Sequence, residues 1–370
     1  MLRPRIKPGH APRLRDNGAV WFGPWLHGMA TELADDSGVV WAICERLDGT
    51  RTRDGLVHEI AEAFPGEVTA DEAGEVLEFL IDSGWVQDLE APIPPELTAR
   101  DLERYRRGIE YLETVNLRPE TDGYRLQARL KASRVTVLGV GGVGSAVAAN
   151  LAASGVGRVH CVDHDVVELS NLSRQLLFAE SDRGQRKVDV TVRRLRELNS
   201  DIEVTGTDAL LDGPDAVLRA VEGSDAFVLC ADRPRGLIRM WANEAGYRSR
   251  IPWLTSAYTG PEFSLAAFVP GRTACAACLA ADARDEGIAN GFPPAALPDE
   301  KDDTHQVTAA SAQISGHYLA LETIHLLLGM RVQTAGRSLQ RFLIDYDQQR
   351  YVESRPRPDC PVGCGDLISP

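Results

Sequence analysis

The chain has 370 residues, of which 25% are charged and 44% hydrophobic, and its formal net charge is −14. This composition indicates a folded globular protein of one or two domains, and the negative charge argues against a general nucleic-acid binder. Because no apolar run reaches membrane-spanning length and no signal-peptide core follows Met1, we expect a cytoplasmic protein with neither nucleic-acid nor membrane partners.

The first 90 residues predict a small α+β domain. Its first 15 positions hold basic residues and no acidic one, which indicates a solvated arm or a basic edge for an acidic partner. The basic residues are Arg3, Arg5, Lys7, Arg13 and Arg15. Short strands are expected at 18–26, and apolar residues at helical spacing predict helices at 38–47, 53–64 and 70–83. A short sheet with such helices indicates a winged-helix-like domain, and acidic residues in the first two helices disfavour DNA binding.

A Pro-rich stretch at 91–95 predicts a stiff linker, and the next residues, 96–115, predict one helix that carries Arg107. The chain therefore divides into three predicted segments. These are a winged-helix-like domain at 1–90, the linker and helix at 91–133, and a Rossmann-like α/β domain with a mostly parallel sheet at 134–370.

A glycine-rich turn is the centre of the third segment. The β-branched run 135–138 predicts a buried parallel strand, the glycines at 139–144 predict a tight turn, and 145–154 predicts a helix. Such a unit aims backbone N–H groups and the positive end of a helix at a phosphate. A second strand at 158–162 ends in Asp163, which is placed to bind a ribose hydroxyl. Alone, this pattern would suggest a dehydrogenase.

Polar residues after the turn favour ATP over NAD. They follow predicted strands or begin a predicted helix, and ligands of open α/β sheets bind at the carboxyl ends of the strands. These residues are Asp165, Arg174, Gln175, Lys187 and Asp232. Arg and Lys neutralise phosphates and an Asp holds Mg²⁺, so the set indicates Mg·ATP, whereas either cation alone could be an ordinary surface charge.

The remainder of the third segment predicts more of the sheet and its helices. Strands are expected at 252–256, 263–269 and 341–346, and a long apolar helix at 307–328. The Pro-, Gly- and acid-rich stretch 282–304 predicts a loop that is long enough to act as a lid.

Four of the seven cysteines form two close pairs, Cys275 with Cys278 and Cys360 with Cys364. Four thiolates suit a tetrahedral structural Zn²⁺ that would hold the C-terminal tail to the domain, and free or redox-active thiols are the alternative. The other three cysteines lie in predicted helices or strands and are expected to be small core residues. They are Cys44, Cys161 and Cys230.

Several motifs between residues 104 and 364 resemble a known enzyme family. They are Arg104-Tyr-Arg-Arg107, Gly139-Val-Gly-Gly-Val-Gly144, Asp163-His-Asp165, Glu168-Leu-Ser-Asn-Leu-Ser-Arg-Gln175, Gly184-Gln-Arg-Lys187 and Cys230-Ala-Asp232. This part of the chain resembles the adenylating enzymes typified by ubiquitin-activating enzyme, most closely the thiamin and molybdopterin adenylyltransferases and the microcin-type peptide adenylating enzymes.

Residues 1–90 resemble a second family, the leader-peptide recognition elements of ribosomal-peptide modifying enzymes. The order of the predicted elements and the phrase Leu47-Asp-Gly-Thr-Arg51 carry this resemblance. In that family the leader of a precursor peptide adds a strand to the edge of the sheet, which needs only an open edge and side-chain pockets. The resemblance implies a precursor peptide as the partner of this domain.

The first resemblance implies the reaction and a role for each motif residue. A C-terminal carboxylate would attack the α-phosphate of ATP, giving an acyl adenylate and pyrophosphate. Glycines would approach the nucleotide, polar residues would contact its ribose, phosphates and Mg²⁺, and a homodimer partner would supply an arginine finger. The glycines are Gly139, Gly141 and Gly142, and Asp163 would bind the ribose. The phosphate contacts would be Asn171, Arg174, Gln175 and Lys187, with Asp165 at the same nucleotide site. Asp232 would hold Mg²⁺, and Arg107 would be the arginine finger.

The chain departs from this family at two places. Many relatives have a reactive cysteine in the loop before the long helix, but 302–311 contains none, so a thioester or persulfide relay there is in doubt. His305 in this stretch is either a substrate contact or a solvated loop residue. The family carries a structural zinc at matching positions, yet Cys360 and Cys364 are separated by three residues where two are usual.

The leading hypothesis is therefore ATP-dependent adenylation of a carboxylate on a ribosomally made precursor peptide, with a further modifying enzyme as a possible downstream partner. The alternatives are a leader-binding scaffold for a separate cyclodehydratase, activation of a ubiquitin-like sulfur carrier and, more remotely, a dehydrogenase. The sequence leaves open which peptide is the substrate and which nucleophile captures the adenylate.

Overall fold

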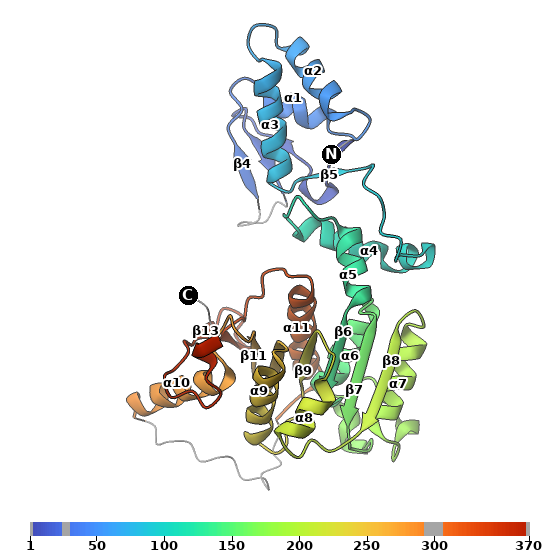
Figure 1. Ribbon diagram of the computed structural model, residues 1–370, viewed down its shortest axis with the longest axis vertical. Helices are drawn as coiled ribbons and strands as arrows, with labels where there is room; N and C mark the ends of the chain where they lie inside the picture. The colour runs from blue at the N-terminus through green and yellow to red at the C-terminus, as the bar shows by residue number, and fades with distance from the viewer. Residues whose placement is uncertain (1–2, 24–29, 292–305, 368–370) are drawn as a thin grey trace. The chain divides into compact units, whose positions relative to one another are not determined.

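The computed structural model describes residues 3–23, 30–291 and 306–367 (Figure 1). The chain folds into two compact units, Met1–Ala128 and Arg129–Pro370. Among the described helices, none combines the length and the apolar character that a membrane span needs.

The first unit contains two small sheets and a group of helices, which confirms the predicted small α+β region. Strand β1 (Pro4–Ile6) pairs antiparallel with β5 (Val86–Asp88). A separate antiparallel sheet has the order β2 (Arg13–Leu14), β3 (Val20–Phe22), β4 (Thr31–Leu33). The helices are α1 (Val39–Arg46), α2 (Arg53–Ala63), α3 (Ala70–Asp82) and α4 (Ala99–Val115).

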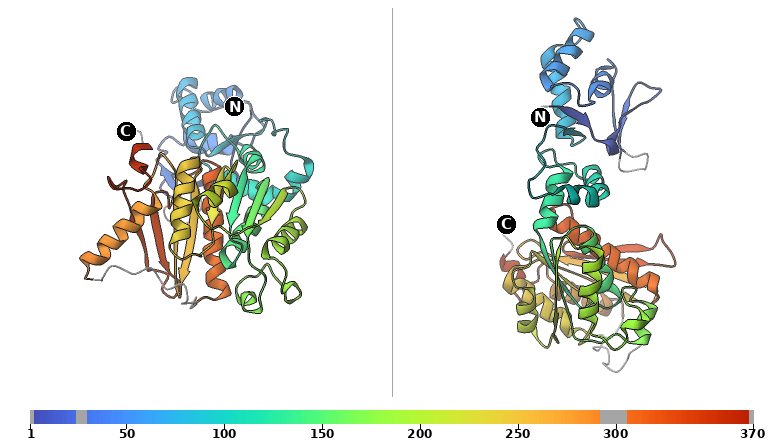
Figure 2. Two further views of the ribbon diagram at one scale, coloured as in Figure 1. Left: turned by 60° about the horizontal axis from the view of Figure 1, so that its bottom comes forward. Right: turned by 90° about the vertical axis from the view of Figure 1, so that its right-hand side faces the viewer.

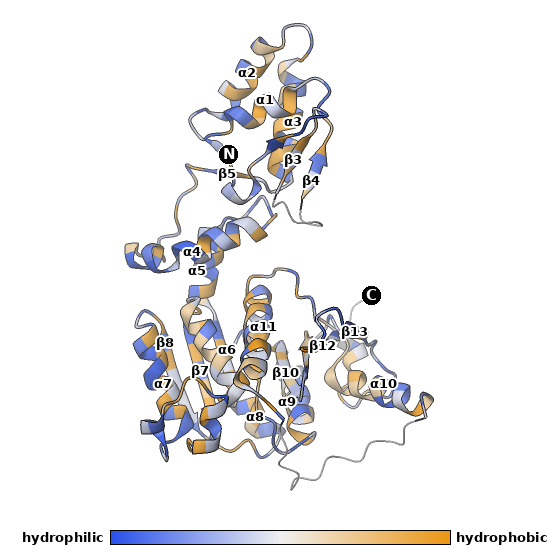
Figure 3. Ribbon diagram, turned by 180° about the vertical axis from the view of Figure 1, so that it is seen from behind, coloured by the Kyte–Doolittle hydropathy of each residue, from blue (hydrophilic) through white to orange (hydrophobic). Residues whose placement is uncertain are grey.

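Local sequence explains where these helices begin. The Thr69 hydroxyl accepts from the backbone N–H of Glu72 while the Glu72 carboxylate accepts from that of Thr69, and Thr98 and Asp101 form the same capping box at α4. The helices of this unit carry hydrophobic residues on one side and hydrophilic ones on the other (Figure 3). The hydrophobic sides enclose a core whose largest fully buried members are Phe22, Ile43, Leu56, Ile60, Leu77 and Leu80.

The basic N-terminal segment is not a solvated arm, which was one of its two interpretations from the sequence. Residues 4–6 form β1, and the short 3-10 helix Pro8–His10 follows. Lys7 is only 2% exposed: its Nζ donates to the carbonyl of Asn116 at 3.0 Å and lies 3.7 Å from Oε2 of Glu113. The prediction failed because these partners lie more than one hundred residues away in sequence, and no local pattern reveals them.

The second unit is built on one eight-stranded sheet. Its order is β13-β12-β11-β10-β9-β6-β7-β8, in which β8, β7, β6, β9 and β10 run parallel and β11, β12 and β13 add antiparallel strands. This mostly parallel, Rossmann-like sheet is the predicted fold class. The strands are β6 (Arg134–Leu138), β7 (Arg158–Asp163), β8 (Glu203–Asp208), β9 (Ala226–Leu229), β10 (Trp253–Thr259), β11 (Glu262–Phe268), β12 (Arg337–Phe342) and β13 (Gln349–Glu353).

Helices cover both faces of this sheet (Figure 2). On one face, α6 (Gly142–Ala153) packs against α7 (Lys187–Leu198) and α11 (Ala309–Leu327). On the other, α8 (Pro214–Val221) and α9 (Leu237–Ser249) enclose a core with Leu138, Phe227 and Trp253. Two helices lie outside this arrangement of layers, α5 (Gly123–Ala132), which precedes β6, and α10 (Ala276–Ala289).

Three predicted boundaries are wrong. Helix α6 begins at Gly142 rather than at 145, because its glycines adopt helical geometry directly after the turn. Helix α10 continues to Ala289, so the first part of the predicted 282–304 loop is helical; its Ala-rich sequence has no Pro to stop it. Strand β12 ends at Phe342, and the sheet edge is β13 rather than 341–346. The rest of the predicted lid, and His305, lie outside the described residues.

Candidate functional site

The site residues gather where the parallel sheet changes its direction of winding. Strands β6 and β9 are neighbours, but the chain leaves β6 towards β7 and leaves β9 towards β10. Ligands of open α/β sheets bind outside the carboxyl ends of strands at such a point. The backbone N–H groups of Cys230 and Ala231 both donate to the Leu138 carbonyl at 2.8 Å, which fixes the segment after β9 against the glycine turn.

Two of the turn glycines are required by the fold itself. Gly139 has a φ of +87°, and a Cβ there would lie 2.6 Å from the Ala231 nitrogen. A Cβ at Gly144 would lie 1.8 Å from the Gly139 carbonyl oxygen. Gly141 is different, because the nearest atom to its Cβ position is Nε2 of Gln175 at 3.6 Å. A Cβ at Gly141 would therefore make an ordinary contact with Gln175 and clash with no atom of the protein.

Two features next to Gly141 lack a partner. Gly141 is the N-cap of α6, and no side chain caps that helix end. Gln175 is 3% exposed, yet its Oε1 has no hydrogen-bond partner among the described residues. Uncapped N–H groups at a helix N-terminus bind anions, and a buried amide without a partner is unfavourable unless a ligand supplies one. The uncapped N–H groups fit the predicted phosphate, whereas the Gln175 oxygen is an acceptor and fits a donor of the ligand, such as a hydroxyl or amino group of the nucleotide.

Asp163, the last residue of β7, holds the turn, and Asp165, two residues further, holds the site lysine. Asp163 Oδ2 accepts from the Val140 N–H at 2.7 Å, and its Oδ1 accepts from the Asp165 N–H at 2.8 Å. Lys187 Nζ donates to Asp165 Oδ2 at 2.9 Å, although the Lys187 side chain is 7% exposed and that of Asp165 is 53% exposed. Partial burial opposes ionisation of Asp165, but Lys187 outweighs it and lowers the pKa of that carboxyl.

The segment between β7 and α7 carries the other predicted phosphate residues. Asn171 lies in the 3-10 helix Leu169–Ser173, where its Oδ1 accepts from the Glu168 N–H at 3.1 Å. Arg174 Nη1 donates to the Ser170 carbonyl at 3.1 Å. A Cβ at Gly142 would lie 3.5 Å from Cγ of Arg174, so this arginine is beside the start of α6. Asn171, Arg174 and Gln175 are thus brought to one end of the sheet.

Two residues at this end of the sheet have no signal in the sequence. Gln313 of α11 donates from Nε2 to the carbonyls of Gly142 and Arg174, at 3.4 and 3.3 Å. Tyr258, in the last part of β10, interacts with both Arg174 and Asp232: burial raises the pKa of its phenol, the Arg174 charge opposes this, and the Asp232 charge adds to it. The sequence around each residue shows only an ordinary strand or helix pattern, so neither could be identified as a site residue from a motif.

Asp232 is the predicted Mg²⁺ ligand, and its exposed side chain follows β9 at the same end of the sheet. Mg²⁺ binds through one or two carboxylates together with substrate phosphates, so a single Asp beside a triphosphate site fits this ion.

Arg107 belongs to the first unit. It lies on α4 with its side chain 79% exposed, and its Nη1 contacts Glu110 Oε2 at 2.9 Å. Its role as an arginine finger stays a prediction.

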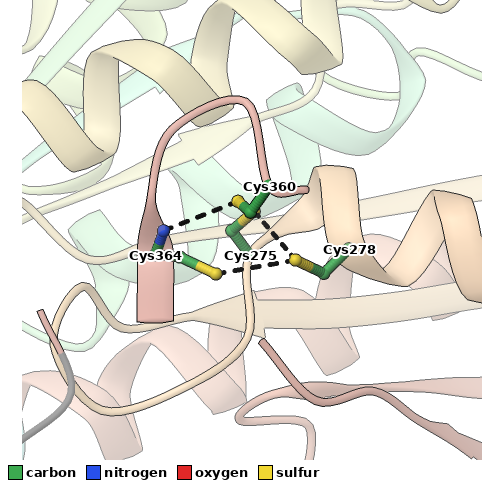
Figure 4. A group of neighbouring side chains, drawn as sticks. All are labelled: Cys275, Cys278, Cys360 and Cys364. Carbon is green, nitrogen blue, oxygen red and sulfur yellow. Dashed lines mark hydrogen bonds between the residues drawn. The ribbon is translucent and has the colours of Figure 1, made fainter. Parts of the chain in front are cut away.

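The four predicted zinc ligands come together at the start of α10 and in the C-terminal segment (Figure 4). The sulfurs of Cys275 and Cys278 are 3.8 Å apart, and those of the pairs Cys275–Cys360 and Cys278–Cys364 are 3.5 Å apart. Tetrahedral Zn–S bonds of about 2.3 Å place sulfurs about 3.8 Å apart. The extra residue between Cys360 and Cys364 therefore does not prevent a tetrahedral donor set.

This arrangement defines a Rossmann-like enzyme with a nucleotide phosphate site and a separate four-cysteine centre. Residues 113–362 match the ThiF family. The sulfur carrier protein ThiS adenylyltransferase of Escherichia coli (strain K12) is 33% identical over 272 residues, which are 73% of this chain and 98% of that protein. The chain belongs to the ThiF family, and the predicted enzyme class, an adenylyltransferase, is confirmed by relatives of that name.

Other similar proteins are matched over different shares of their own length. The adenylyltransferase and sulfurtransferase MOCS3 of Bos taurus is 31% identical over 278 residues, and this chain spans 56% of its length. Among solved structures, E. coli MccB with ATP has a TM-score of 0.75 at 21% identity, covering 98% of this chain and 100% of that chain. MccB, a microcin C7 biosynthetic enzyme, has also been solved with N-formylated MccA. At this identity the likeness concerns the fold.

Proposed function

We propose that this enzyme adenylates a carboxylate on a ribosomally made precursor peptide and that its first unit holds the leader of that peptide. The observation that carries the proposal is the difference in coverage. The ThiS adenylyltransferase is matched over 98% of its own length by only 73% of this chain. MccB, solved with the peptide MccA, has a fold that extends over 98% of this chain. The N-terminal part that the former leaves unmatched is therefore shared, in fold, with a peptide-binding enzyme.

The first unit offers a surface for strand addition. β3 is the central strand of its three-stranded sheet, so β2 and β4 are edge strands. An extended peptide pairs with such an edge through its backbone and is selected through side-chain pockets. Phe79 on α3 is half exposed, and its ring meets Trp85 edge-on, which in turn stacks on Phe22 of β3. Because Phe22 and Trp85 are buried, the exposed ring of Phe79 would contact a large apolar residue of the leader.

In the proposed reaction, an oxygen of the substrate carboxylate attacks the α-phosphorus of ATP. A carboxylate–phosphorus bond forms, the bond to the β-phosphate oxygen breaks, and pyrophosphate leaves. Lys187, Arg174 and the N–H groups at the start of α6 bind the negative charge and hold the phosphates in line. Mg²⁺, held by Asp232, would neutralise the charge of the departing pyrophosphate.

No cysteine of the chain is placed to form a thioester after this step. Four of the seven belong to the four-cysteine centre, and Cys44 lies in the core of the first unit. Burial raises the pKa of the Cys161 thiol to about 12 and also raises that of Cys230. Thiolates are the reactive form, so the acyl adenylate would be captured by a nucleophile from the substrate or from another protein.

The test is ATP–pyrophosphate exchange by the full chain with a candidate precursor peptide encoded beside its gene. We expect exchange that depends on the peptide's C-terminal carboxylate and whose KM rises when the leader is removed. A peptide that supports no exchange while a ubiquitin-like sulfur carrier does would replace this proposal by the second candidate. That candidate is favoured by the 33% identity to the ThiS adenylyltransferase.

The homodimer and its arginine finger are part of the proposal and can be tested by mixing subunits. Arg107→Ala and Lys187→Met proteins are each expected to be inactive. If Arg107 acts on the site of the partner subunit, mixed dimers contain one intact site, and random mixing restores about a quarter of the sites. No recovery on mixing, with dimers present, would contradict a finger acting between subunits.

We also infer that the four-cysteine centre holds Zn²⁺. The metal would stabilise the C-terminal segment on α10, where Arg357 already pairs with Asp282 and Asp285 at 2.8 and 2.7 Å. The measurement is metal content by elemental analysis. We expect one zinc per chain, and much less in Cys278→Ser, which should also melt at a lower temperature.

A further inference from the structure

Asp182 is a buried carboxylate that no motif assigns to the site. It lies in the short 3-10 helix Glu180–Asp182, in the segment between β7 and α7, and only 2% of its surface is exposed. Its Oδ1 accepts from Arg193 Nη2 at 2.7 Å, and its Oδ2 accepts from the Ala179 N–H at 2.9 Å and from Arg194 Nη2 at 3.3 Å. A buried carboxylate with this many donors stays ionised and holds its partners in a fixed geometry.

These contacts tie the segment to a helix that packs in the sheet layer. Arg193 and Arg194 lie in the middle of α7, whereas Ala179 and Asp182 lie in the segment that precedes it. Val167 and Phe178 of the same segment form a small buried cluster with Val190 of α7. The cluster is apolar and non-directional, so it leaves the rotation of the segment to directional bonds such as those of Asp182.

A short ladder of backbone bonds leads from Asp182 to the site. The Gln185 N–H donates to the Asp182 carbonyl at 3.0 Å, and the Gln185 carbonyl accepts from the Val167 N–H at 2.9 Å. Two residues further, the Lys187 N–H donates to the Asp165 carbonyl at 2.9 Å. This ladder places the Lys187 ammonium on the Asp165 carboxylate.

We propose that Asp182 is a positioning residue for nucleotide binding: by holding Arg193 and Arg194 it fixes the segment that presents Arg174, Gln175 and Lys187 to the phosphates. It acts through these residues and does not touch the nucleotide. The inference rests on the proposed nucleotide site. It adds to the known motif residues one that controls how accurately they are placed, since a displacement near 1 Å at a reacting group has a large effect.

The experiment is a calorimetric titration of the full chain with Mg·ATP. Asp182→Asn keeps the size of the side chain but removes its charge, and we expect the Kd for Mg·ATP to rise about tenfold or more. The matched control is Glu197→Gln, because Glu197 is an exposed acid that contacts the same Arg194 at 3.4 Å. The control should bind Mg·ATP as the wild type does.

A second pair of variants separates positioning from loss of fold. Arg193→Met and Arg194→Met each leave Asp182 in place and remove one donor, and each should raise the Kd less than Asp182→Asn. Added to the Arg193→Met/Arg194→Met background, Asp182→Asn should cause much less of a further change. In pyrophosphate exchange the KM for ATP should rise more than kcat falls, whereas partial unfolding would lower kcat alone.

Two outcomes would overturn the inference: a wild-type Kd in Asp182→Asn, or the same loss of affinity in Glu197→Gln. These results do not depend on the proposed reaction. A wild-type chain that binds Mg·ATP but supports no exchange with any carboxylate substrate would refute the proposed function and still allow the role of Asp182 to be measured.

Discussion

Two lysine–carboxylate pairs in this protein both have a buried lysine but differ in their distance and in the exposure of the carboxylate. Lys187 and Asp165 lie 2.9 Å apart at the open end of the sheet, and half of the Asp165 side chain is exposed. Lys7 and Glu113 lie 3.7 Å apart inside the first unit, with side chains 3% and 10% exposed. The first pair sits beside an uncapped helix end, whereas the second joins the N-terminal segment to the end of α4.

The difference lies in what satisfies each charge. Glu113 Oε1 accepts from the Gly123 N–H, and Lys7 donates to the Asn116 carbonyl, so most polar atoms of this pair have partners within its own unit. Glu113 Oε2 makes no hydrogen bond among the described residues and is offset by the Lys7 charge at 3.7 Å. At the other site, Gln175 Oε1 has no hydrogen-bond partner and the start of α6 has no side-chain cap among the described residues. Groups that the protein completes stabilise the fold, whereas groups that it leaves incomplete are available to a ligand.

The largest expected effect comes from breaking the buried pair. Lys7→Met leaves Glu113 charged and without its cation, and we expect the free energy of unfolding to fall by about 3–5 kcal/mol. Urea denaturation measures it. Adding Glu113→Gln should recover much of the loss, because an uncharged pair of similar size removes the stranded charge. A single variant as stable as the wild type would show that this pair is not structural.

The corresponding substitution at Lys187 should lower activity and leave stability nearly unchanged. Lys187→Met removes a cation that would stabilise charge on the phosphates, so kcat/KM for exchange should fall by about 10²–10³. The denaturation midpoint should change little, since Asp165 can be solvated. Retained product formation would favour the scaffold hypothesis over an active adenylation site.

Two glycines of the turn provide a smaller contrast of the same kind. Gly139→Ala forces a positive φ on alanine and a contact with the Ala231 nitrogen, so it should destabilise the fold by about 1–3 kcal/mol. Gly141→Ala meets no protein atom closer than 3.6 Å and should leave stability unchanged. Its Kd for Mg·ATP should instead rise roughly tenfold, on the order of 1.4 kcal/mol. Wild-type affinity in this variant would place the phosphates elsewhere.

The smallest effects are in the pH dependence of stability. Asp165 contributes at the acid end of the pH scale and Lys7 at the alkaline end. The pKa of Asp165 is lowered by Lys187, so its contribution is complete above the unfolded pKa of about 3.9 and is lost as pH falls through the lower folded pKa. Because Asp165 is half exposed, the amount is below about 1 kcal/mol. Asp165→Asn should remove this acid-side dependence.

Lys7 acts on the alkaline side. Burial lowers its pKa, with Glu113 opposing, so the unfolded chain holds more protons than the folded one between the lowered pKa and about 10.4. The Lys7 term therefore favours folding more as pH rises through that window. Denaturation of the wild type and of Lys7→Met at several alkaline pH values measures the difference, and parallel curves would contradict the assignment.

The sequence predicted the parts of the site whose signals are local. The strand, glycine turn and helix follow one another within twenty residues, and Asp163, Lys187 and Asp232 mark the ends or starts of neighbouring elements. Gln313 and Tyr258 were missed because each reaches the site from a distant element with an unremarkable pattern. Asp182 was missed because its role depends on two hydrogen-bond donors, Arg193 and Arg194, which lie eleven and twelve residues further along the chain on α7.

By itself, the sequence determined the fold class and the family and predicted a set of nucleotide-binding residues, since these depend on periodicity, turn chemistry and motif spacing. Only the tertiary structure decided which charges are buried and which are open. It enclosed Lys7, which belongs to a segment that could have been a solvated arm, and left Gln175 Oε1 without a hydrogen-bond partner among the described residues. Burial depends on what packs against a residue from elsewhere in the chain, and that information is not present in its neighbours in sequence.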